Sequence, residues 1–463
     1  MIPADEDPGV ARALYLFRER TVGRFATINL TQGSAWRDLV LQLTVTDLGV
    51  RSAAIALAAS SENLAHMSPS SSDSLTENHK FYLRYYNRAI KVIRENIATI
   101  ESAKDDRIVP CLVTNSLFTA IELSCNTLDR GFVHVRSGVW IARSYFTNVA
   151  RSRQKLRFFY IEILRSLFER LNTFLPMFPG HGTSRYEIVL PDSNSPLGDT
   201  DGDNIEGPPY FASFQRAKNA LYNLLRSEHV LNHHANRTIW NTSPNLNNCN
   251  ISYLEYQHHI SLLLFRTNSF LGALSHYLAI ARSALTELDL YLSVLLTLHA
   301  RLLVLRLTIC QNSPTIRFPE TTYDAYTASF SEALNSIKGL ERMLTTNVGV
   351  DFIAHLPDVH PIFWIGCKSR DPHVRRLALG MLKSRTHKQN VWCGATQAKV
   401  LERIIEVEED GIDGGVTASG DVDESRRIQD LAMEIDYQNK RAGFRYWVLN
   451  EYGYVVMKEE ILC

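Results

Sequence analysis

The sequence predicts an all-α fold, built as an irregular stack of paired helices of the solenoid or bundle type. Apolar residues recur at helical spacing through most of the chain, and the sustained alternation typical of strands is scarce. No repeat of fixed period is visible, which argues against a regular repeat array. With 463 residues, of which 45% are apolar, the chain is long enough for one large domain or several ordinary ones.

Helical segments follow one another along the chain. FYLRYYNRAIKVIRENI carries one apolar stripe that includes Tyr82, Tyr86, Ala89 and Ile93. The stretches PCLVTNSLFTAIELS and DRGFVHVRSGVWIAR are expected to be helices, and QKLRFFYIEILRSLFERLNTFLPMF a long helix that ends at its prolines. Helices are also expected over 210–227, 252–284, 286–310, 324–345, 372–385 and 395–408.

The end of the chain is the one candidate for strands. In FRYWVLNEYGYVVMKEEI, Asn450 to Gly453 fits the turn of a short C-terminal hairpin, and a helix fits nearly as well. Three polar stretches predict mobile surface loops near 67–78, 180–209 and 409–425. Because the helical segments on both sides of each loop look alike, we interpret residues 1–463 as a single domain.

Charge and cysteine content narrow the class of protein. Lys plus Arg and Asp plus Glu both number 49, whereas a free-standing nucleic-acid-binding domain usually carries a basic excess. The seven cysteines include no C-x-x-C pair, which is typical of reduced cysteines in a cytosolic or nuclear protein. The acidic N-terminal stretch lacks the apolar core of a secretory signal, so none is expected.

The most apolar stretch, LDLYLSVLLTLHARLLVLRLTIC at 288–310, is long enough to span a bilayer. Asp289, His299, Arg301 and Arg306 would then lie in or near the hydrocarbon, at a cost of several kcal/mol. We therefore expect a buried core helix and no membrane partner.

The stretch GCKSRDPHVRRLALGMLKS, from Gly366 to Ser384, contains a strong helix start. Asp371 is a good N-cap and Pro372 suits the first helical position. The apolar residues Val374, Leu377, Ala378, Met381 and Leu382 follow at helical spacing. Arg375, Arg376 and Lys383 are expected to fall away from that apolar face.

Two interpretations of this basic helix remain open. It is either an anion or nucleic-acid site at a helix end, or a solvated basic face that pairs with acidic neighbours. The candidate neighbours are Glu406, Glu408 and Glu409. We favour the second interpretation, in which the arginines form salt bridges and help to brace the C-terminal part of the stack.

Patterns for metal binding are weak. Asp199, Asp201 and Asp203 have the spacing of a calcium loop, but Asn204 and Tyr210 stand where an EF-hand needs Gly and Glu. A zinc site would need one histidine pair to meet a second polar cluster, and a polar loop between helices is the favoured interpretation. The residues of that candidate set are His229, His233, Glu255, His258 and His259. No metal or cofactor is therefore expected.

Catalytic signatures are equally scarce. The chain has no G-x-S-x-G, H-E-x-x-H, G-x-G-x-x-G or P-loop string. A catalytic Cys–His pair stays open, although no cysteine has a distinguishing context. We assign no catalytic residue and do not expect an enzyme.

Several stretches in a fixed order carry a family resemblance. They are ALYLFRERTVGRF, SAWRDLVLQLTVTDLGVRSAAIALAA, KFYLRYYNRAIKVIR, CLVTNSLFTAIELSCNTLDRGFVHVRSGVWI, PPYFASFQRAKNALYNLL, CKSRDPHVRRLALGMLKS and VLERIIEVEE. From about residue 12 to 457, the chain thereby resembles the regulatory (fungal-specific transcription factor) domain of fungal zinc-cluster transcription factors. The late signature of that domain falls on Lys368, Arg370, Asp371, Pro372, Arg375 and Arg376.

One departure from the family matters. Its members usually bind DNA through a zinc cluster of six cysteines in C-x2-C-x6-C repeats, whereas the first cysteine here is Cys111, inside the regulatory region. The family's base-specific contacts therefore map to no residue of this chain, and direct DNA binding is not expected.

The resemblance implies a nuclear transcription regulator, with the cytoplasm as the alternative location. It also implies protein partners, either the transcription machinery or a full-length relative, a possible small-molecule ligand, and control of a secondary-metabolite gene cluster. Two other functions stay open: an α-helical interaction scaffold with no direct role in DNA binding, and an enzyme with an unrecognised helical site.

Overall fold

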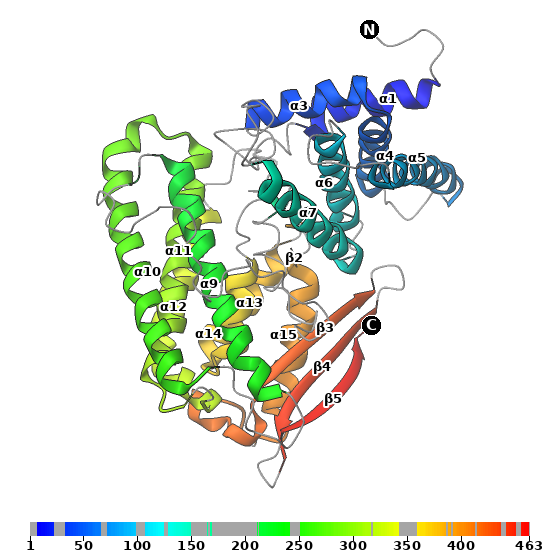
Figure 1. The fold of residues 1–463 in the computed structure, drawn as a ribbon. Coiled ribbons are helices and arrows are strands. Elements are labelled where there is room, and N and C mark those ends of the chain that lie inside the picture. The colour runs from blue at the N-terminus through cyan, green and yellow to red at the C-terminus, as the bar shows by residue number, and fades with distance from the viewer. Residues whose placement is uncertain are drawn as a thin grey trace. The chain divides into compact units, whose positions relative to one another are not determined.

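The computed structural model describes most of the chain. The described residues are 7–22, 33–65, 72–98, 107–124, 128–149, 164, 167–168, 211, 213–240, 251–315, 318–341, 359–385, 388–389, 392–412, 414–436, 441–450 and 455–462. They are mostly helical, with a small antiparallel sheet at the C-terminal end (Figure 1), which confirms the predicted all-α class.

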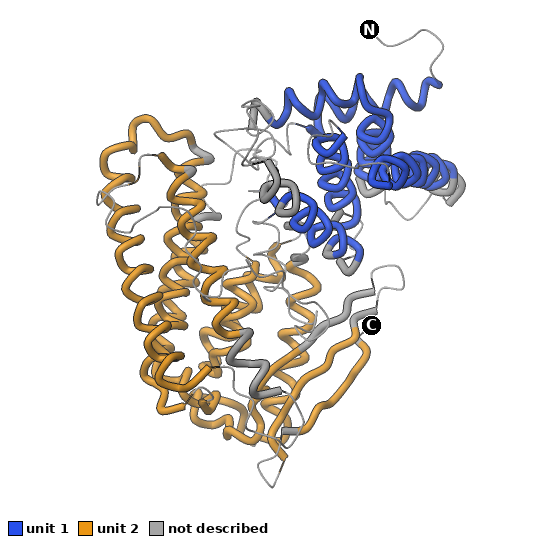
Figure 2. The backbone as a smooth tube through the Cα atoms, viewed as in Figure 1, with its two compact units in different colours: residues 1–175, 349–355 blue, residues 176–348, 356–463 orange. Residues whose placement is uncertain are grey.

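The chain divides into two compact units. Unit 1 comprises residues 1–175 and 349–355, and unit 2 comprises residues 176–348 and 356–463 (Figure 2). The single domain expected over 1–463 stays a prediction. The expected long helix after Gln154, the loop at 180–209 and the calcium-like aspartates fall almost wholly outside the described residues.

Unit 1 is a group of helices around a central apolar one. Its elements are α1 (Pro8–Leu16), the π-helical turn η1 (Phe17–Thr21), α3 (Gly33–Thr46), α4 (Leu48–Ala65), α5 (Ser72–Ala98), α6 (Ile108–Ser124) and α7 (Leu128–Val149). Helix α4 packs against α1, α3, α5 and α6. Its buried alanines, among them Ala53, Ala54 and Ala56, leave room for that close approach.

The described part of the expected loop at 67–78 is helical, because α5 already begins at Ser72. The predicted apolar stripe of this helix is confirmed over its first part, where Tyr82, Tyr86 and Ala89 are buried, whereas Ile93 is half-buried. The polar residues that suggested a loop form the first turns of α5, ahead of the stripe.

Unit 2 contains two groups of helices. The long helices are α9 (Phe214–Trp240), α10 (Tyr253–Ala281), α11 (Glu287–Asn312) and α12 (Thr327–Glu341). The shorter ones are α13 (Val359–Lys368), α14 (Pro372–Ser384) and α15 (Gly394–Glu409), which contact one another, and α14 also contacts α12. Ser252 and Thr286 start α10 and α11 with capping boxes, in which side chain and backbone satisfy each other's donors.

Helix α11 contains the most apolar stretch of the sequence. By length and composition, Asp289–Asn312 and the bent pair Trp36–Thr46 with Leu48–Glu62 each pass as candidate membrane spans. The protein buries 61% of the apolar window of α11, and this helix packs against α9, α10 and α12. This packing agrees with the predicted core helix, and the absence of a membrane partner stays a prediction.

Strands form at the C-terminal end of unit 2. The hairpin interpretation is confirmed, since β4 (Arg441–Leu449) pairs antiparallel with β5 (Val455–Leu462) in the register Trp447↔Met457. A third strand, β3 (Asp430–Asp436), pairs with β4 and was not expected. Phe444, Tyr446 and Val448 alternate as buried residues of β4. A further two-residue pair, β1 (Lys388–Gln389) with β2 (Trp392–Cys393), precedes α15.

Short 3-10 turns complete unit 2. They are η4 (Arg282–Ala284), η5 (Glu320–Tyr326), η6 (Ser419–Asp421) and η7 (Glu424–Arg426). The predicted loop at 409–425 contains η6 and η7, and Gly411, Gly414 and Gly415 adopt the positive φ angles that glycine tolerates best. The side chain of Glu424, in η7, contacts the start of η5, so this segment is tied to the helical core.

Candidate functional site

Helices α13 and α14 meet at a tight turn that holds the predicted signature. Asp371 has the extended backbone of an N-cap, and its Oδ1 accepts a hydrogen bond from the Val374 N–H at 2.9 Å. Pro372 occupies the first helical position, where a missing N–H costs nothing. Both predictions about this helix start are confirmed.

Gly366 lets α13 approach α15 closely. A Cβ at this position would lie 2.5 Å from Cδ2 of Leu401, closer than carbon atoms approach. The Gly366 carbonyl also accepts a hydrogen bond from Arg375 Nε at 3.2 Å, which joins a side chain of α14 to the backbone of α13. The glycine therefore sets the spacing of three helices.

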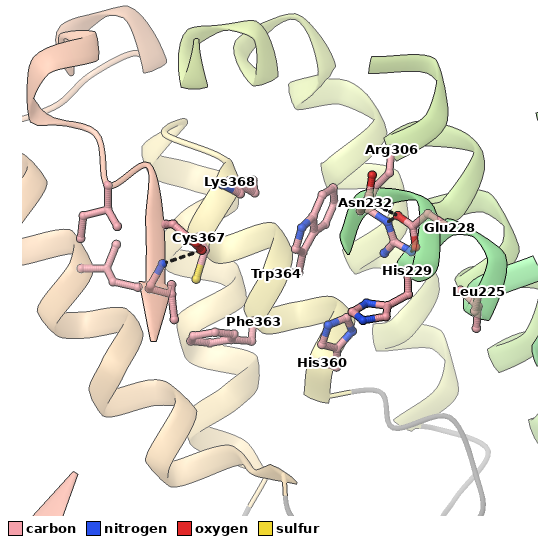
Figure 3. A pocket seen from close by; sticks show the side chains of 14 residues that line it. Leu225, Glu228, His229, Asn232, Arg306, His360, Phe363, Trp364, Cys367 and Lys368 are labelled. Atoms are coloured by element: carbon pink, nitrogen blue, oxygen red, sulfur yellow. Dashed lines mark hydrogen bonds and ion pairs between the residues drawn. The ribbon is translucent and has the colours of Figure 1, made fainter. Parts of the chain in front are cut away.

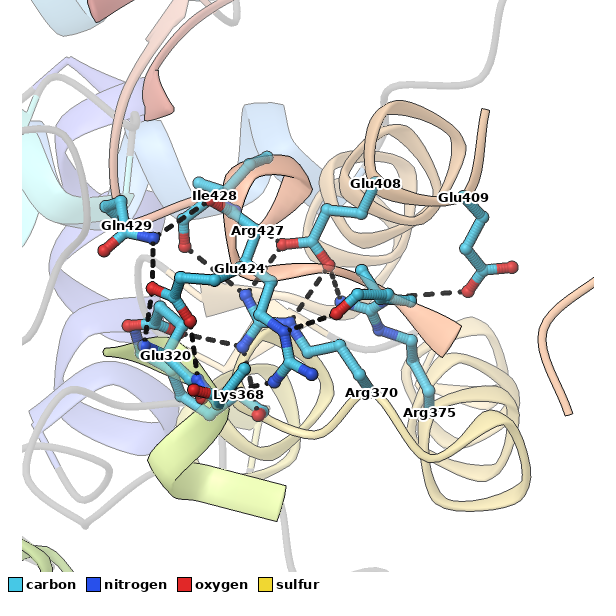
Figure 4. Close-up of polar contacts among 12 residues, drawn as sticks. Glu320, Lys368, Arg370, Arg375, Glu408, Glu409, Glu424, Arg427, Ile428 and Gln429 are labelled. Carbon is cyan, nitrogen blue, oxygen red and sulfur yellow. Dashed lines mark hydrogen bonds and ion pairs between the residues drawn. The ribbon is translucent and has the colours of Figure 1, made fainter. Parts of the chain in front are cut away.

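Arg370 lies at the centre of a buried ionic cluster, which we define as Glu320, Lys368, Arg370, Arg375, Glu408 and Glu409 (Figure 4). Its side chain is 0% exposed. The guanidinium donates to Glu320 Oε2 at 2.8 Å and to Glu408 Oε1 at 2.7 Å and Oε2 at 3.2 Å. It also donates to the carbonyls of Lys368 and Ile428, so all its donors are used.

Glu408 is the acidic counterpart of Arg370. Its side chain is 0% exposed, and it accepts hydrogen bonds from Arg370, from Arg375 Nη2 and from the Ile428 N–H at 2.7 Å. Burial alone would raise the pKa of Glu408, but the charges of Arg370 and Arg375 lower it to about 2. The carboxyl group is therefore ionised at neutral pH, inside the protein.

Arg375 corrects one prediction from the sequence. It was expected to fall away from the apolar face of α14, yet it is 0% exposed and contacts Glu408 and Glu409. The carboxylates of α15 compensate its charge, which is why the helix can bury it. Arg376 is 48% exposed and pairs with Glu409 Oε2 at 2.6 Å, as the salt-bridge interpretation expected.

The remaining predicted partners are distributed differently. Lys383 pairs with Glu402 of α15, and Glu406 pairs with Arg403 of its own helix at 2.9 Å rather than with α14. At the other end of the cluster, Lys368 Nζ lies 2.6 Å from Glu320 Oε1. Each of the four signature cations thus contacts a carboxylate of the same unit.

Arg427 forms a second buried ion pair beside the cluster. Its guanidinium is 0% exposed and donates to both oxygens of Asp324, at 2.8 and 2.7 Å. Glu424 accepts from the backbone N–H groups of Glu320 and Thr321, at 2.9 and 2.8 Å. These contacts, together with Arg370, fasten η5, the turn before α14, α15 and the segment before β3 to one another.

A cavity of about 330 Å³, which we call the α13 pocket, opens next to the cluster (Figure 3). Residues from α9, α11, α13, α15 and the start of β3 line it. They are Leu225, Glu228, His229, Asn232, Arg306, His360, Phe363, Trp364, Cys367, Lys368, Ile404, Ile428, Asp430 and Leu431. Lys368 and Ile428 belong to the pocket and also contact cluster residues.

Polar contacts organise one side of the α13 pocket. Arg306 holds Glu228 in a bidentate pair, with Nε–Oε1 at 2.7 Å and Nη2–Oε2 at 2.8 Å. Asn232 donates to the same carboxylate at 3.3 Å and accepts from the Tyr256 hydroxyl at 3.3 Å. The Arg306 guanidinium carbon also lies 5.7 Å from the centre of the Trp364 ring. In Figure 3, Glu228, Asn232 and Arg306 gather beside Trp364.

Burial shifts the pKa of one thiol and one imidazole that line the α13 pocket. Burial raises the pKa of Cys367 to about 12, so its thiol stays protonated at neutral pH and is a weak nucleophile. Burial also lowers the pKa of His360 well below its usual value, which keeps the imidazole neutral.

The candidate zinc residues are placed only in part. His229 lines the α13 pocket, Glu255 accepts hydrogen bonds as part of the N-terminal cap of α10, and the side chain of His233 lies outside the described residues. Across the described residues, no group of three or more His, Cys, Asp or Glu side chains is arranged to hold a metal ion.

Sequence reasoning missed several members of the site. Glu320, Asp324, Arg427 and Asp430 lie far from the signature in the chain, and no local motif marks them.

Comparisons of the chain with protein-family models, with curated proteins and with solved structures found no match.

Proposed function

We propose that this chain is the regulatory domain of a transcription regulator of the fungal zinc-cluster type, and that the domain acts through protein partners. The order of its family-like stretches supports the proposal. The partners are the transcription machinery or a full-length relative that carries the zinc cluster. The proposed location is the nucleus, and the proposed targets are genes of secondary metabolism.

One observation favours this proposal over direct DNA binding: the cations of the late signature are paired with carboxylates of the same unit. Arg370 and Arg375 are 0% exposed and held by carboxylates, and Lys368 and Arg376 are paired with Glu320 and Glu409. To reach Arg370 or Arg375, a DNA phosphate would have to displace these carboxylates, and the displaced carboxylates would be buried negative charges without compensation. The contacts of this late signature therefore support a structural role inside unit 2 and do not favour DNA binding.

Two measurements test the proposal. In the first, the purified chain is mixed with genomic DNA fragments in a gel-shift assay at about 150 mM salt, where weak phosphate contacts are suppressed. We expect no shift. Sequence-selective binding would mean that helices of this chain read DNA, and the proposal would fail in that part.

In the second measurement, the chain is fused to an unrelated DNA-binding domain and reporter transcription is measured. We expect a change in transcription relative to the DNA-binding domain alone. A fusion that carries Glu408→Gln, which disrupts the buried ionic cluster, should lose this effect, whereas the matched control Glu406→Gln, at an exposed side chain of the same helix, should keep it. A fusion that expresses well but leaves transcription unchanged would favour the interaction scaffold.

A further inference from the structure

The α13 pocket has the size and lining of a small-molecule site. Its volume of about 330 Å³ falls in the range of ligand pockets, which are mostly apolar with a few polar groups. The apolar part of the lining consists of Leu225, Phe363, Trp364, Ile404, Ile428 and Leu431. Phe363 and Trp364 supply aromatic rings from one helix, α13 (Figure 3).

The charges around this cavity cancel, with one exception. Glu228 is neutralised by Arg306 through two hydrogen bonds, and Lys368 is paired with Glu320. Asp430, at the start of β3, has no such partner among the residues that the structure describes. Among the described residues, its carboxylate accepts one hydrogen bond, from the N–H of Leu431 at 2.9 Å.

Partial removal from water raises the pKa of the Asp430 carboxyl group, while the residue as a whole stays exposed. The positive charge of Lys368 offsets this only in part, and Glu320 acts in the opposite direction. A cation placed beside Asp430 would favour the ionised carboxylate and bind to it directly.

We propose that the α13 pocket binds a small, largely apolar molecule that carries a protonated amine. The ammonium group pairs with the carboxylate of Asp430, and the apolar body lies against Phe363 and Trp364. Hydrogen bonds between charged groups are roughly twice as strong as neutral ones, and an aromatic face also attracts cations. An anionic ligand is disfavoured, because Arg306 and Lys368 already hold carboxylates and Asp430 would repel it.

This inference goes beyond the role proposed in transcription, because binding is measured on the purified chain without DNA or partners. If no amine binds, the gel-shift and reporter results are unaffected. If the reporter shows no change in transcription, the proposal about the pocket is unaffected.

The test compares three probes that share one indole body. Tryptamine carries the amine, 3-ethylindole is neutral and indole-3-propionate is anionic. Isothermal titration calorimetry of the full chain should show that tryptamine binds at least about tenfold more tightly than the other two, from the strength of a charged hydrogen bond. Equal affinities, preference for the anion, or no tryptamine binding at millimolar concentration would overturn the proposal.

Variants then assign the binding to this cavity. Asp430→Asn keeps the shape of the side chain and should weaken tryptamine about tenfold, while the neutral probe is unaffected. Asp423→Asn, an exposed residue outside the cavity, is the matched control and should change neither probe. Trp364→Phe, which shrinks the aromatic wall, should also weaken tryptamine. Unchanged tryptamine affinity in a folded Asp430→Asn or Trp364→Phe chain would refute the assignment.

Discussion

Replacing Glu408 by glutamine tests how strongly the buried ionic cluster stabilises unit 2. The carboxylate accepts hydrogen bonds from Arg370, Arg375 and the Ile428 N–H, and it is 0% exposed. Glutamine keeps the shape but removes the charge and one acceptor oxygen, so two buried guanidinium groups lose compensation. Removing one partner of a buried ion pair costs about 3–5 kcal/mol.

The pKa of Glu408 gives a second route to the same magnitude. It is about 2 in the folded protein, against a usual value of 4.5. At about 1.4 kcal/mol per pH unit, this difference corresponds to about 3 kcal/mol of stability at neutral pH. The two routes agree, so we expect Glu408→Gln to lower the free energy of unfolding by about 3–5 kcal/mol.

The assay is urea unfolding at pH 7, followed by circular dichroism and tryptophan fluorescence. Glu406→Gln is the matched control, because the same change is made on the same helix at a side chain that is 63% exposed and pairs with Arg403. An exposed pair of this kind contributes at most about 1 kcal/mol. If the two variants unfold at the same urea concentration, the reasoning about the cluster is wrong.

A double-mutant cycle isolates the pair itself. Arg375→Met alone leaves Glu408 with less compensation, and Glu408→Gln alone does the same for Arg375. In the double variant neither charge is left without its partner at this contact. The loss in the free energy of unfolding should therefore be smaller than the sum of the two single losses by about 0.5–3 kcal/mol. Strict additivity would mean that the two side chains do not act as a pair.

Further predictions concern pH, the helix cap and helix spacing. Because the pKa of Glu408 lies lower in the folded state than in the unfolded one, its stabilisation is complete above about pH 4.5 and is lost as pH falls towards about 2. Acid unfolding curves of the unmodified chain and Glu408→Gln should therefore converge over this range. Asp371→Ala should lower the free energy of unfolding by about 0.5–2 kcal/mol through loss of the cap, and an unchanged melting temperature would contradict this. Gly366→Ala should destabilise by about 1–3 kcal/mol through its clash with Leu401, whereas Gly380→Ala, with nothing near its Cβ, should be neutral or stabilising in the same thermal melts.

The helices of unit 2 follow from local rules. The cap at Asp371, the proline after it and the apolar spacing of α14 are all readable within a few residues, and the structure reproduces them. The starts of α10 and α11 are likewise set by local capping boxes. Such features depend on hydrogen bonds between near neighbours, so the sequence contains both partners side by side.

The burial of Arg375 depends on contacts that no local rule reveals. A helical pattern treats arginine as polar and assigns it to solvent, yet its partner Glu408 lies 33 residues later. Arg370 depends on Glu320, 50 residues earlier, and Arg427 on Asp324, 103 residues earlier. The sequence marks each of these residues only as charged, and the fold alone decides which charges meet inside. The α13 pocket could not be predicted from the sequence for the same reason, because its lining residues come from five elements that are separate in the chain.

The cluster and the pocket share their scaffold. Glu408 accepts from the N–H of Ile428 and Arg370 donates to its carbonyl, so the ion pairs fix the backbone of a pocket residue two positions before Asp430. Lys368 also connects the cluster to the pocket, because it lines the pocket and its ammonium group pairs with Glu320. The compensated cluster therefore holds the backbone next to Asp430, whose carboxylate has no cationic partner among the described residues. Buried ion pairs are expensive ways to hold a fold together, since apolar packing serves as well. Here the ion pairs also connect to the pocket, through their contacts with Ile428 and Lys368.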